Sequence, residues 1–326
     1  MDDAAFPAGR RGLAGWPAAA PGERGLRHLA LFYQTPDDYL RSAVGFLCAA
    51  LDRDEPVFAA VPGHRVGQLR QALAADAGRV VFGDIVTIGR NPANLIPAVR
   101  AFLDRHPGER VSYLGEPAWP ARSDTELLEA ARNDALVNLA FADVPATIMC
   151  PYDLTGLPPE VLTDAESTHP TLVRRGASRP SGRYLGPGRI PPRCDQPLAS
   201  PPGDARSVTY RADLRVVRDL AGGCAADAGL PTDRVQDLML AVSEVAANTL
   251  RHTTAAGTLR VWHTETEIIC QIDDSGWIAD PLAGRVHPPF DQPRGHGLWL
   301  VNQVCDLVEV RTSALGSSIR LHLSLR

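Results

Sequence analysis

Between Arg174 and Ala205 the apolar residues follow neither a helical nor a strand pattern, and this interruption most limits how the chain can fold. The stretch is crowded with Pro, Gly and Arg. A segment of this composition buries too little apolar surface to offset the entropy lost on ordering it. We therefore predict a linker here, with a folded domain on either side. The predicted parts are a flexible N-terminus over residues 1–24, a domain over 25–173, the linker over 174–205 and a second domain over 206–326.

Before the linker, short apolar runs alternate with longer helical patterns, as in HLALFY, YLRSAVGFLCAAL, PVFAAV and VGQLRQALAA. Strands and helices that take turns in this way are typical of a mostly parallel sheet covered by helices. The later pattern predicts helices over 95–105 and 124–139 and strands over 111–115 and 146–152. The first domain is therefore predicted to be of the α/β class.

After the linker, the pattern predicts a short strand, two helices, two strands, a third helix and two final strands. The second helix begins near Pro231, and Thr232 or Asp233 can cap its unpaired amides. The last strand alternates apolar residues from Ile319 to Leu325 with polar ones. The second domain is therefore predicted to be an α+β sandwich, an antiparallel sheet with helices on one face.

Composition excludes several classes of activity. All 33 basic residues are Arg, so neither a Walker-type phosphate loop nor a Schiff-base enzyme has its lysine. A net charge of -5 gives no signature of polyanion binding, and no direct nucleic-acid partner is expected. Six cysteines without a CxxC pair argue against a zinc knuckle and a disulfide framework. Residues 1–23 lack an uninterrupted apolar run, so we expect neither a signal peptide nor a membrane anchor, and a cytoplasmic protein.

The second helix of the second domain carries polar groups suited to a magnesium phosphate. Glu244 and Asn248 are four residues apart and therefore share a face, which His252 continues. An amide oxygen is a neutral ligand for Mg²⁺, and a carboxylate can orient or deprotonate a nucleophile. Taken alone, the same spacing is also typical of a solvated polar face.

Glycines and a carboxylate follow at three later points in the chain. Asp274 ends a predicted strand, where it can accept a hydrogen bond from an adenine amine, and Gly276 lets the backbone approach the ring. The alternative for this segment is a simple turn. Gly295 and Gly297 directly precede a helix, so the helix amides can face phosphate oxygens. Ser317 lies where the last strand opens.

In this order the elements resemble the N box and the two glycine boxes of the GHKL ATPase superfamily, which includes gyrase, Hsp90, histidine kinases and the anti-sigma serine kinases. The resemblance covers residues 206–326, and the run GLWLVNQVCDLVEV looks like the anti-sigma branch. It implies binding of ATP and Mg²⁺. The roles it implies are Asn248 as magnesium ligand, Glu244 as general base, Asp274 as adenine contact with Gly276 beside it, Gly295 and Gly297 as phosphate-lid glycines, and Ser317 as a further nucleotide contact.

Two positions depart from the family pattern. Ile278 replaces the second glycine of D-x-G-x-G, and Trp299 stands where a further glycine is frequent. These changes leave ATP binding as the better inference and put efficient phosphoryl transfer in question. Neither His169 nor His252 lies in a two-helix phosphoacceptor hairpin, so we expect a serine of a partner protein, rather than a histidine of this chain, as the acceptor.

The first domain resembles the MEDS sensory domain in the runs HLALFY, GEPAW, CPYDLTGLP and STHPTL. The resemblance implies a RecA-like α/β fold without a working phosphate loop, and an unknown small ligand. Residue types alone allow a mixed metal site, but structural roles are favoured because no two candidates are spaced as a metal motif. The candidates expected at the carboxyl ends of the strands, where α/β sheets hold ligands, are His28, Glu116, Cys150, Tyr152, Asp153 and His169.

Together the two resemblances are those of anti-sigma factor regulatory proteins of the RsbA type. They imply a signal-responsive regulator that binds a sigma factor, or phosphorylates a STAS-type antagonist on serine, with a homodimer as one compatible state. The alternative is a non-catalytic ATP-binding module that sequesters a partner protein. The sequence offers no nucleophile, base and orienting group from which the first domain could be built into an enzyme.

Overall fold

The computed structural model describes residues 25–288 and 295–325, so the predicted flexible N-terminus lies outside the described residues. Two compact units make up the chain, and each is assembled from several segments. The first unit comprises Met1–Asp84, His106–Pro120 and Asp143–Tyr184. The second comprises Ile85–Arg105, Ala121–Ala142 and Leu185–Arg326.

A seven-stranded sheet forms the centre of the first unit, in the order β3-β2-β4-β5-β1-β6-β7. Neighbouring strands are parallel, except that β7 runs antiparallel to β6. The strands are β1 (Arg27–Tyr33), β2 (Val57–Val61), β3 (Val80–Asp84), β4 (Val111–Gly115), β5 (Ala146–Asp153), β6 (Thr171–Arg174) and β7 (Ala177–Pro180).

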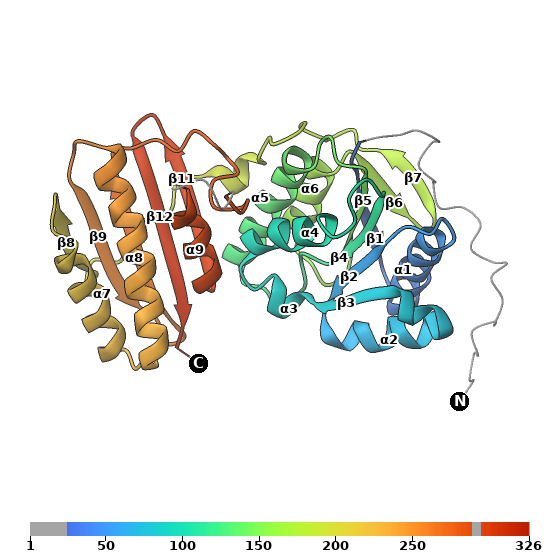
Figure 1. The fold of residues 1–326 in the computed structure, drawn as a ribbon, viewed down its shortest axis with the longest axis horizontal. Helices are drawn as coiled ribbons and strands as arrows, with labels where there is room; N and C mark the ends of the chain where they lie inside the picture. Colours follow the sequence, from blue (N-terminus) through green and yellow to red (C-terminus); the bar gives the residue numbers. More distant parts are fainter. Residues whose placement is uncertain (1–24, 289–294, 326) are drawn as a thin grey trace. The chain divides into compact units, whose positions relative to one another are not determined.

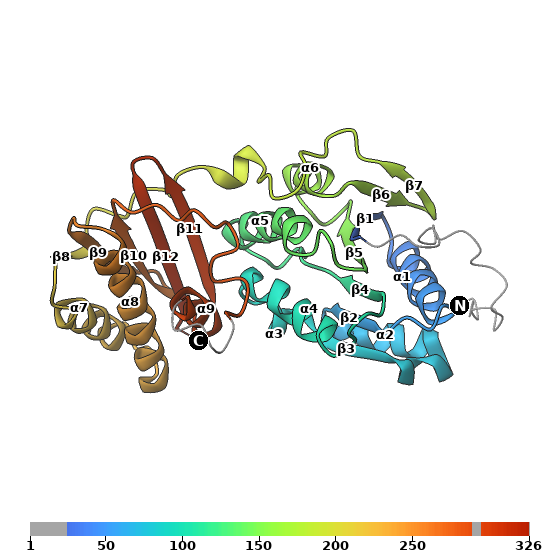
Figure 2. The same cartoon turned by 45° about the horizontal axis from the view of Figure 1, so that its top comes forward.

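The central strands of this sheet are continuous apolar runs, as strands buried on both faces require. Leu29, Leu31 and Tyr33 of β1 point to one face, where they pack with apolar side chains of two helices. These helices, drawn in blue in Figure 2, are α1 (Pro36–Leu51) and α2 (Gly63–Leu73). A 3-10 segment, η1 (Ala74–Arg79), and the helix α6 (Pro159–Thr168) complete the first unit.

A five-stranded antiparallel sheet in the order β11-β12-β10-β9-β8 forms the centre of the second unit. Helices α7 (Arg215–Asp227), α8 (Thr232–His252) and α9 (His296–Val304) cover one face (Figure 1). Their apolar stripes and the inward side chains of the strands form one core. The strands are β8 (Arg206–Tyr210), β9 (Gly257–His263), β10 (Glu267–Asp274), β11 (Leu307–Ser313) and β12 (Gly316–Ser324).

The second unit also contains helices from earlier in the chain. The helix α5 (Asp124–Ala140) begins with a capping box, in which Ser123 and Glu126 satisfy each other's backbone amides. The shorter elements are α3 (Ile85–Ile88), η2 (Pro92–Asn94), α4 (Leu95–Leu103) and η3 (Pro192–Asp195).

The structure confirms the predicted fold class, a mostly parallel α/β sheet joined to an antiparallel sheet with helices on one face. The predicted cap of α8 is wrong. Its N-cap is Pro231, which has no side-chain hydrogen bond to offer, so neither Thr232 nor Asp233 caps the helix.

The segment predicted as a linker, residues 174–205, contains ordered contacts. It includes β7 and η3, and Cys194 of η3 is fully buried. Within the second unit, Arg311 and Arg320 donate hydrogen bonds to the carbonyl oxygens of Gln196 and Ala199. Arginine side chains that reach main-chain carbonyls therefore order this segment without an apolar period.

No disulfide joins any of the six cysteines, all of which lie in the described part of the chain. In residues 25–288 and 295–325, no helix combines the length and apolarity that a membrane crossing needs.

Candidate nucleotide site

The first turn of α9 packs directly against the polar face of α8. A Cβ atom at Gly297 would lie 2.8 Å from Oε2 of Glu244 and 3.6 Å from Nδ2 of Asn248. Only a glycine at this position leaves the space in front of these two side chains open. The structure thus brings Glu244, Asn248 and Gly297 together, although the chain separates the two helices.

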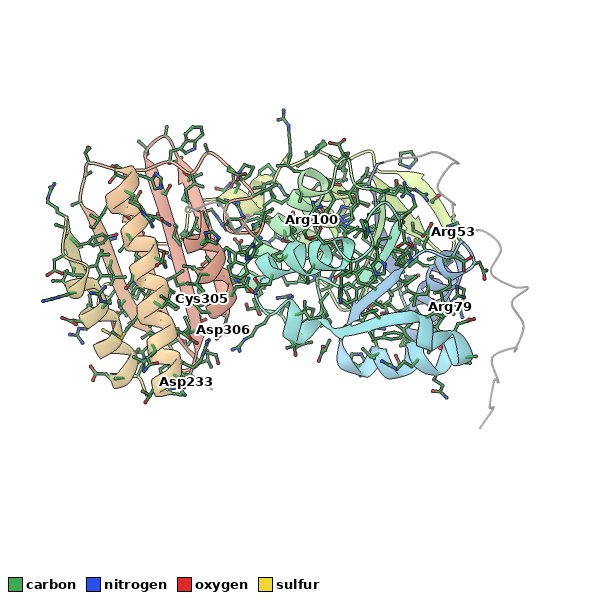
Figure 3. All side chains as sticks on the ribbon, in the orientation of Figure 1. Arg53, Arg79, Arg100, Asp233, Cys305 and Asp306 are labelled. Atoms are coloured by element: carbon green, nitrogen blue, oxygen red, sulfur yellow. The ribbon has the colours of Figure 1, made fainter. Side chains whose placement is uncertain are left out.

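A set of charged contacts holds the far end of α9 to the start of α8. Arg234 donates to the carbonyl oxygen of Val304 at 2.8 Å and to Oδ1 of Asp306 at 3.0 Å. Cys305 and Asp306, labelled in Figure 3, lie where α9 gives way to β11. Oδ2 of Asp306 also accepts the amide of Ser324 on β12. These bonds fix the position of α9, and with it the position of Gly297.

Asp274, the predicted adenine contact, is held in place through both of its carboxylate oxygens. Oδ2 accepts the hydroxyl of Thr249 at 2.6 Å, and Oδ1 accepts the amide of Gly276 at 2.7 Å. Tyr210 of β8 donates to the same threonine hydroxyl at 3.0 Å. Burial raises the pKa of Tyr210 to about 12, so its proton remains available for this bond. A carboxylate oxygen can accept more than one hydrogen bond, so Asp274 keeps acceptor capacity for a ligand.

Ser317 secures the loop that follows β10. Its hydroxyl donates to the carbonyl oxygen of Gly276 at 2.8 Å and lies 2.9 Å from Oγ1 of Thr312. The amide of Ile278 donates to the same Thr312 oxygen. In the structure Ser317 therefore supports the Gly276 backbone.

Asn248 has a partner on its own helix. Arg251 donates from Nη2 to Oδ1 of Asn248 at 2.7 Å. This oxygen is the one that would coordinate a magnesium ion. Because Arg251 is exposed, its side chain can move from Asn248 to a phosphate oxygen without breaking core packing.

The glycines at the start of α9 include one in a backbone conformation that favours glycine. Gly295, the N-cap of α9, has a φ of 96°, a left-handed conformation that favours glycine. Arg294, the residue before it, lies outside the described residues. Trp299, which replaces a family glycine, packs edge-on against His287 with ring centroids 4.5 Å apart.

The residues present fit a magnesium nucleotide. Gly297 leaves room beside the carboxylate of Glu244 and the amide Nδ2 of Asn248. Rotation of this amide would turn Oδ1 toward the same space, and a carboxylate and an amide oxygen are donor types that Mg²⁺ prefers. Gly276 lies against the oriented Asp274, so a planar ring could approach the backbone there. In this arrangement Asn248 would hold the ion, and the ion would neutralise phosphate charge when bound.

An ionic cluster joins α5 to the segment that leads into α9, within the second unit. Glu129 of α5, whose exposure is 1 %, lies 2.7 Å from Nη1 of Arg311 and 3.4 Å from Nη2 of Arg285. Arg285 also donates to Oδ1 of Asn133 at 3.2 Å. Burial lowers the pKa of Arg285 to about 10, although Glu129 favours its charged form. We call Glu129, Arg132, Arg285 and Arg311 the Glu129 cluster, in which Arg132 Nε lies 3.7 Å from the carboxylate.

The candidate residues of the first unit separate into two groups. Glu116 follows β4 at the carboxyl edge of the sheet, where it accepts the hydroxyl of Tyr33 at 3.1 Å and pairs with Arg65. The Arg65 guanidinium also stacks 3.7 Å from the ring of Tyr39. Burial raises the pKa of Glu116 to about 7 against the opposing effect of Arg65.

The six candidates, which could have converged at that edge, do not all lie there. His28, near the start of β1, lies against Cys150 of β5 and His169, which caps α6. Tyr152 packs edge-on against His169, with centroids 5.6 Å apart. Asp153 accepts hydrogen bonds from Thr155. Sequence order could not separate these groups, because strand direction and side-chain alternation decide which edge or face a residue occupies.

Sequence reasoning missed Thr249 and Tyr210, which orient Asp274. Thr249 directly follows Asn248 and faces the core, where its exposure is 1 %. A hydroxyl at a position of the apolar stripe was the available signal, because a buried hydroxyl needs a partner.

Two family models match the chain. The model of the MEDS family, the methanogen/methylotroph DcmR sensory domain, matches residues 27–170. The model of the histidine kinase-like ATPase domain matches residues 209–323. Residues 121–142, which include α5, therefore fall inside the MEDS match and within the second compact unit. No curated protein matches this chain.

Three solved structures match this chain at low sequence identity. The RsbU and RsbW domains of Rv1364c from Mycobacterium tuberculosis match with 16 % identity and a TM-score of 0.27, over 36 % of this chain and 32 % of that one. A solved ATPase domain matches with 15 % identity and a TM-score of 0.28, over 46 % of this chain and 69 % of that one. The flagellar accessory protein FlaH from Methanocaldococcus jannaschii matches with 14 % identity and a TM-score of 0.27, over 51 % and 82 %.

This chain thus spans about a third of the length of the mycobacterial chain it matches. The assignment of its parts comes from the two family models. The chain contains a MEDS domain over residues 27–170, followed by a histidine kinase-like ATPase domain over residues 209–323.

Proposed function

We propose that this protein is a signal-responsive regulator of sigma-factor activity, which binds ATP with Mg²⁺ and acts as an anti-sigma factor, a serine kinase of an anti-sigma antagonist, or both. The observation that carries the proposal is the packing of Gly297 against Glu244 and Asn248. Because of this packing, the N-terminus of α9, which would face the phosphates, lies beside two side chains of α8. Asn248 would hold the ion, and Glu244 would activate the acceptor.

Each residue of the site then has a physical role. Asp274 accepts the adenine amine, and Gly276 allows the ring to approach its backbone. The amides that follow Gly295 and Gly297 donate to phosphate oxygens at the start of α9. Glu244 orients the serine hydroxyl of the acceptor and accepts its proton as the phosphoryl group leaves ATP.

Phosphoryl transfer is tested with Glu244→Gln, which keeps the shape of the side chain and removes the base. We expect ATP affinity to stay within about threefold and phosphorylation of a STAS-type antagonist to slow by roughly 10²- to 10⁴-fold. The measurement is a phosphoserine mass shift over time. Glu265→Gln, at an exposed position, is the matched control and should transfer at the unmodified rate.

If Glu244→Gln transfers the phosphoryl group at an unchanged rate, Glu244 is not the general base. A complete lack of transfer by the unmodified protein to any antagonist would remove the kinase activity and leave the second candidate.

The second candidate is a non-catalytic module that binds ATP and sequesters a partner protein. It is favoured by the bulky Ile278 and Trp299 at family glycine positions, and by the bond from Arg251 to the oxygen of Asn248 that would hold the ion. It predicts ATP binding without turnover, and capture of a sigma factor that persists in Glu244→Gln. Loss of capture in Asp274→Asn, with its weakened ATP site, would link capture to the nucleotide.

The Glu129 cluster supports a route by which a signal reaches the nucleotide site. Glu129 lies on α5, inside the MEDS match, whereas Arg285 lies in the segment between Gly276 and Gly295. Asn302 of α9 also donates to the carbonyl oxygen of Gly284, next to Arg285. A shift of α5 would therefore pull on the segment that leads into the phosphate-facing turn. We infer that the sensory domain acts on ATP binding through this helix.

A further inference from the structure

His28, Cys150 and His169 place three metal-ligating side chains together in the first unit. His28 on β1 and Cys150 on β5 point to the same face, because Cys150 is the register partner of Ala30, two residues from His28. Nε2 of His28 lies 3.5 Å from Sγ of Cys150. The rings of His28 and His169 lie 3.9 Å apart between centroids. One ligand atom from each residue lies within 4.8 Å of those of the others.

Hydrogen bonding fixes the tautomer of His169 and leaves its other ring nitrogen, Nε2, available to this cluster. Nδ1 lies 2.9 Å from the carbonyl oxygen of Ala165 and therefore carries the proton. Nε2 then has a lone pair, and it is buried without a hydrogen-bond partner. A histidine that donates Nδ1–H to a main-chain carbonyl and offers Nε2 is a common arrangement of metal-binding histidines.

The His169 side chain is fully buried, and its Nδ1–H is held by the main-chain carbonyl oxygen of Ala165. An imidazole in this form keeps its Nε2 lone pair for a metal ion. A purely structural role accounts for the contact between Cys150 and His28, but it leaves Nε2 of His169 without a partner.

We propose that His28, Cys150 and His169 bind a divalent metal ion of the zinc type. Two imidazole nitrogens and a thiolate are ligands that Zn²⁺ takes in proteins, whereas Mg²⁺ and Ca²⁺ prefer oxygen. The Cys150 thiol loses its proton to solvent as the ion enters, since the thiolate is the ligand. These three residues supply three of the ligand atoms of such a site. The site is separate from the nucleotide site and does not depend on its function.

Cobalt gives the most specific readout, because a Co²⁺–thiolate bond adds a charge-transfer absorption that oxygen and nitrogen ligands lack. The purified full-length chain, stripped of metal, is titrated with Co²⁺ and then with Zn²⁺. We expect the band to saturate at one Co²⁺ per chain and to disappear as Zn²⁺ displaces the ion. Absence of the band in the unmodified protein overturns the proposal.

Cys150→Ser and Cys48→Ser form the matched pair of variants. Cys48 lies on α1 in the same unit, outside the cluster. We expect the band and one equivalent of bound Zn²⁺ to remain in Cys48→Ser. In Cys150→Ser we expect the band to be lost and Zn²⁺ affinity to fall by at least about 100-fold, since loss of a ligand exceeds loss of an outer hydrogen bond. A band of equal intensity in Cys150→Ser overturns the assignment.

A measurement on the unmodified chain covers the case in which Cys150→Ser does not fold. An ion that binds only the folded state raises the unfolding temperature of that state. One equivalent of Zn²⁺ should therefore raise the thermal midpoint of the metal-free protein, and the same concentration of Mg²⁺ without ATP should not. A midpoint that Zn²⁺ leaves unchanged counts against the site.

Discussion

At the scale of single residues, Asp274 shows how a short network prepares a side chain for a ligand. Thr249 and Gly276 each donate to one of its oxygens, and Tyr210 donates to Thr249. These bonds fix the carboxylate without a ligand, so the proposed contact with adenine would cost little ordering entropy.

Replacement of Asp274 by Asn tests this contact. The amide keeps an acceptor for Gly276 but loses the charge and turns a donor toward Thr249. The loss of a buried hydrogen bond costs about 1–3 kcal/mol, which corresponds to roughly tenfold to hundredfold weaker ATP binding. Isothermal titration of ATP measures the effect, and the exposed Asp233→Asn is the control. An unchanged affinity would mean that Asp274 does not contact the base.

A second residue-scale prediction concerns His322 on β12, whose exposure is 6 %. Burial alone would lower its pKa, but hydrogen bonds to Glu267 and Glu309 outweigh burial and raise the pKa to about 9. Because the folded pKa lies above the unfolded value of about 6.5, the added stability is fully present below pH 6.5. It is lost as the pH rises through about 9.

The expected loss between these pH values is on the order of 3 kcal/mol. Hydrogen exchange of the β12 amides measures it locally, which suits a chain of two units whose unfolding need not be two-state. His322→Gln should flatten the dependence, and the exposed His263→Gln should keep it. If the stability of β12 changes with pH equally in the unmodified protein and in both variants, the assignment of the charge to His322 is refuted.

At the scale of elements, a substitution at the contact between α8 and α9 should change function while it leaves stability almost unaltered. A Cβ at Gly297 would meet the end of the Glu244 side chain, which can move, rather than the backbone. We therefore expect Gly297→Ala to displace the Glu244 carboxylate and lower phosphoryl transfer, while the thermal midpoint changes little because Ala favours the helix.

Gly223→Ala on α7 is the control for this substitution, because a Cβ there meets nothing within 4 Å. It should stabilise the protein by about 0.5–1 kcal/mol and leave ATP binding and transfer unchanged. Unaltered transfer in Gly297→Ala would show that the Glu244 position is not critical.

At the scale of the whole molecule, the Glu129 cluster ties helix α5 to the ATPase domain. Removal of one partner of a buried ion pair costs about 3–5 kcal/mol, because it leaves uncompensated buried charge. We expect Glu129→Gln to lower the stability of the second unit by this amount and to loosen residues 279–288. ATP affinity should fall roughly tenfold, or about 1.4 kcal/mol, which is the cost of reordering about one residue of the segment on binding.

Hydrogen exchange and ATP titration of the full-length protein give the two readouts. Asp124→Asn, at an exposed position in the first turn of α5, should cost no more than about 0.5 kcal/mol and leave ATP affinity unchanged. If Glu129→Gln destabilises the unit without any effect on ATP binding, the cluster is structural and the proposed route for the signal is wrong.

Much of the fold could be predicted because it follows from local patterns. The alternation of β12 and the apolar stripe of α8 placed these elements correctly, since side-chain period distinguishes strand from helix. The order of the nucleotide elements indicated a site, and the close approach of Gly297 to Glu244 and Asn248 agrees with it. Covalent sequence alone fixes such periods and motif orders.

Other features depended on contacts between residues far apart in the chain. The polar face of β12 looks solvated in sequence, yet His322 is buried there and pairs with Glu267 and Glu309. The segment around η3 has no apolar period, and long-range bonds from Arg132 order it. His28, Cys150 and His169 have no metal-motif spacing, because three separate elements bring them together. The sequence determined the elements and their polarity, whereas tertiary structure decided which polar groups became partners, since burial and pairing are properties of the assembled chain.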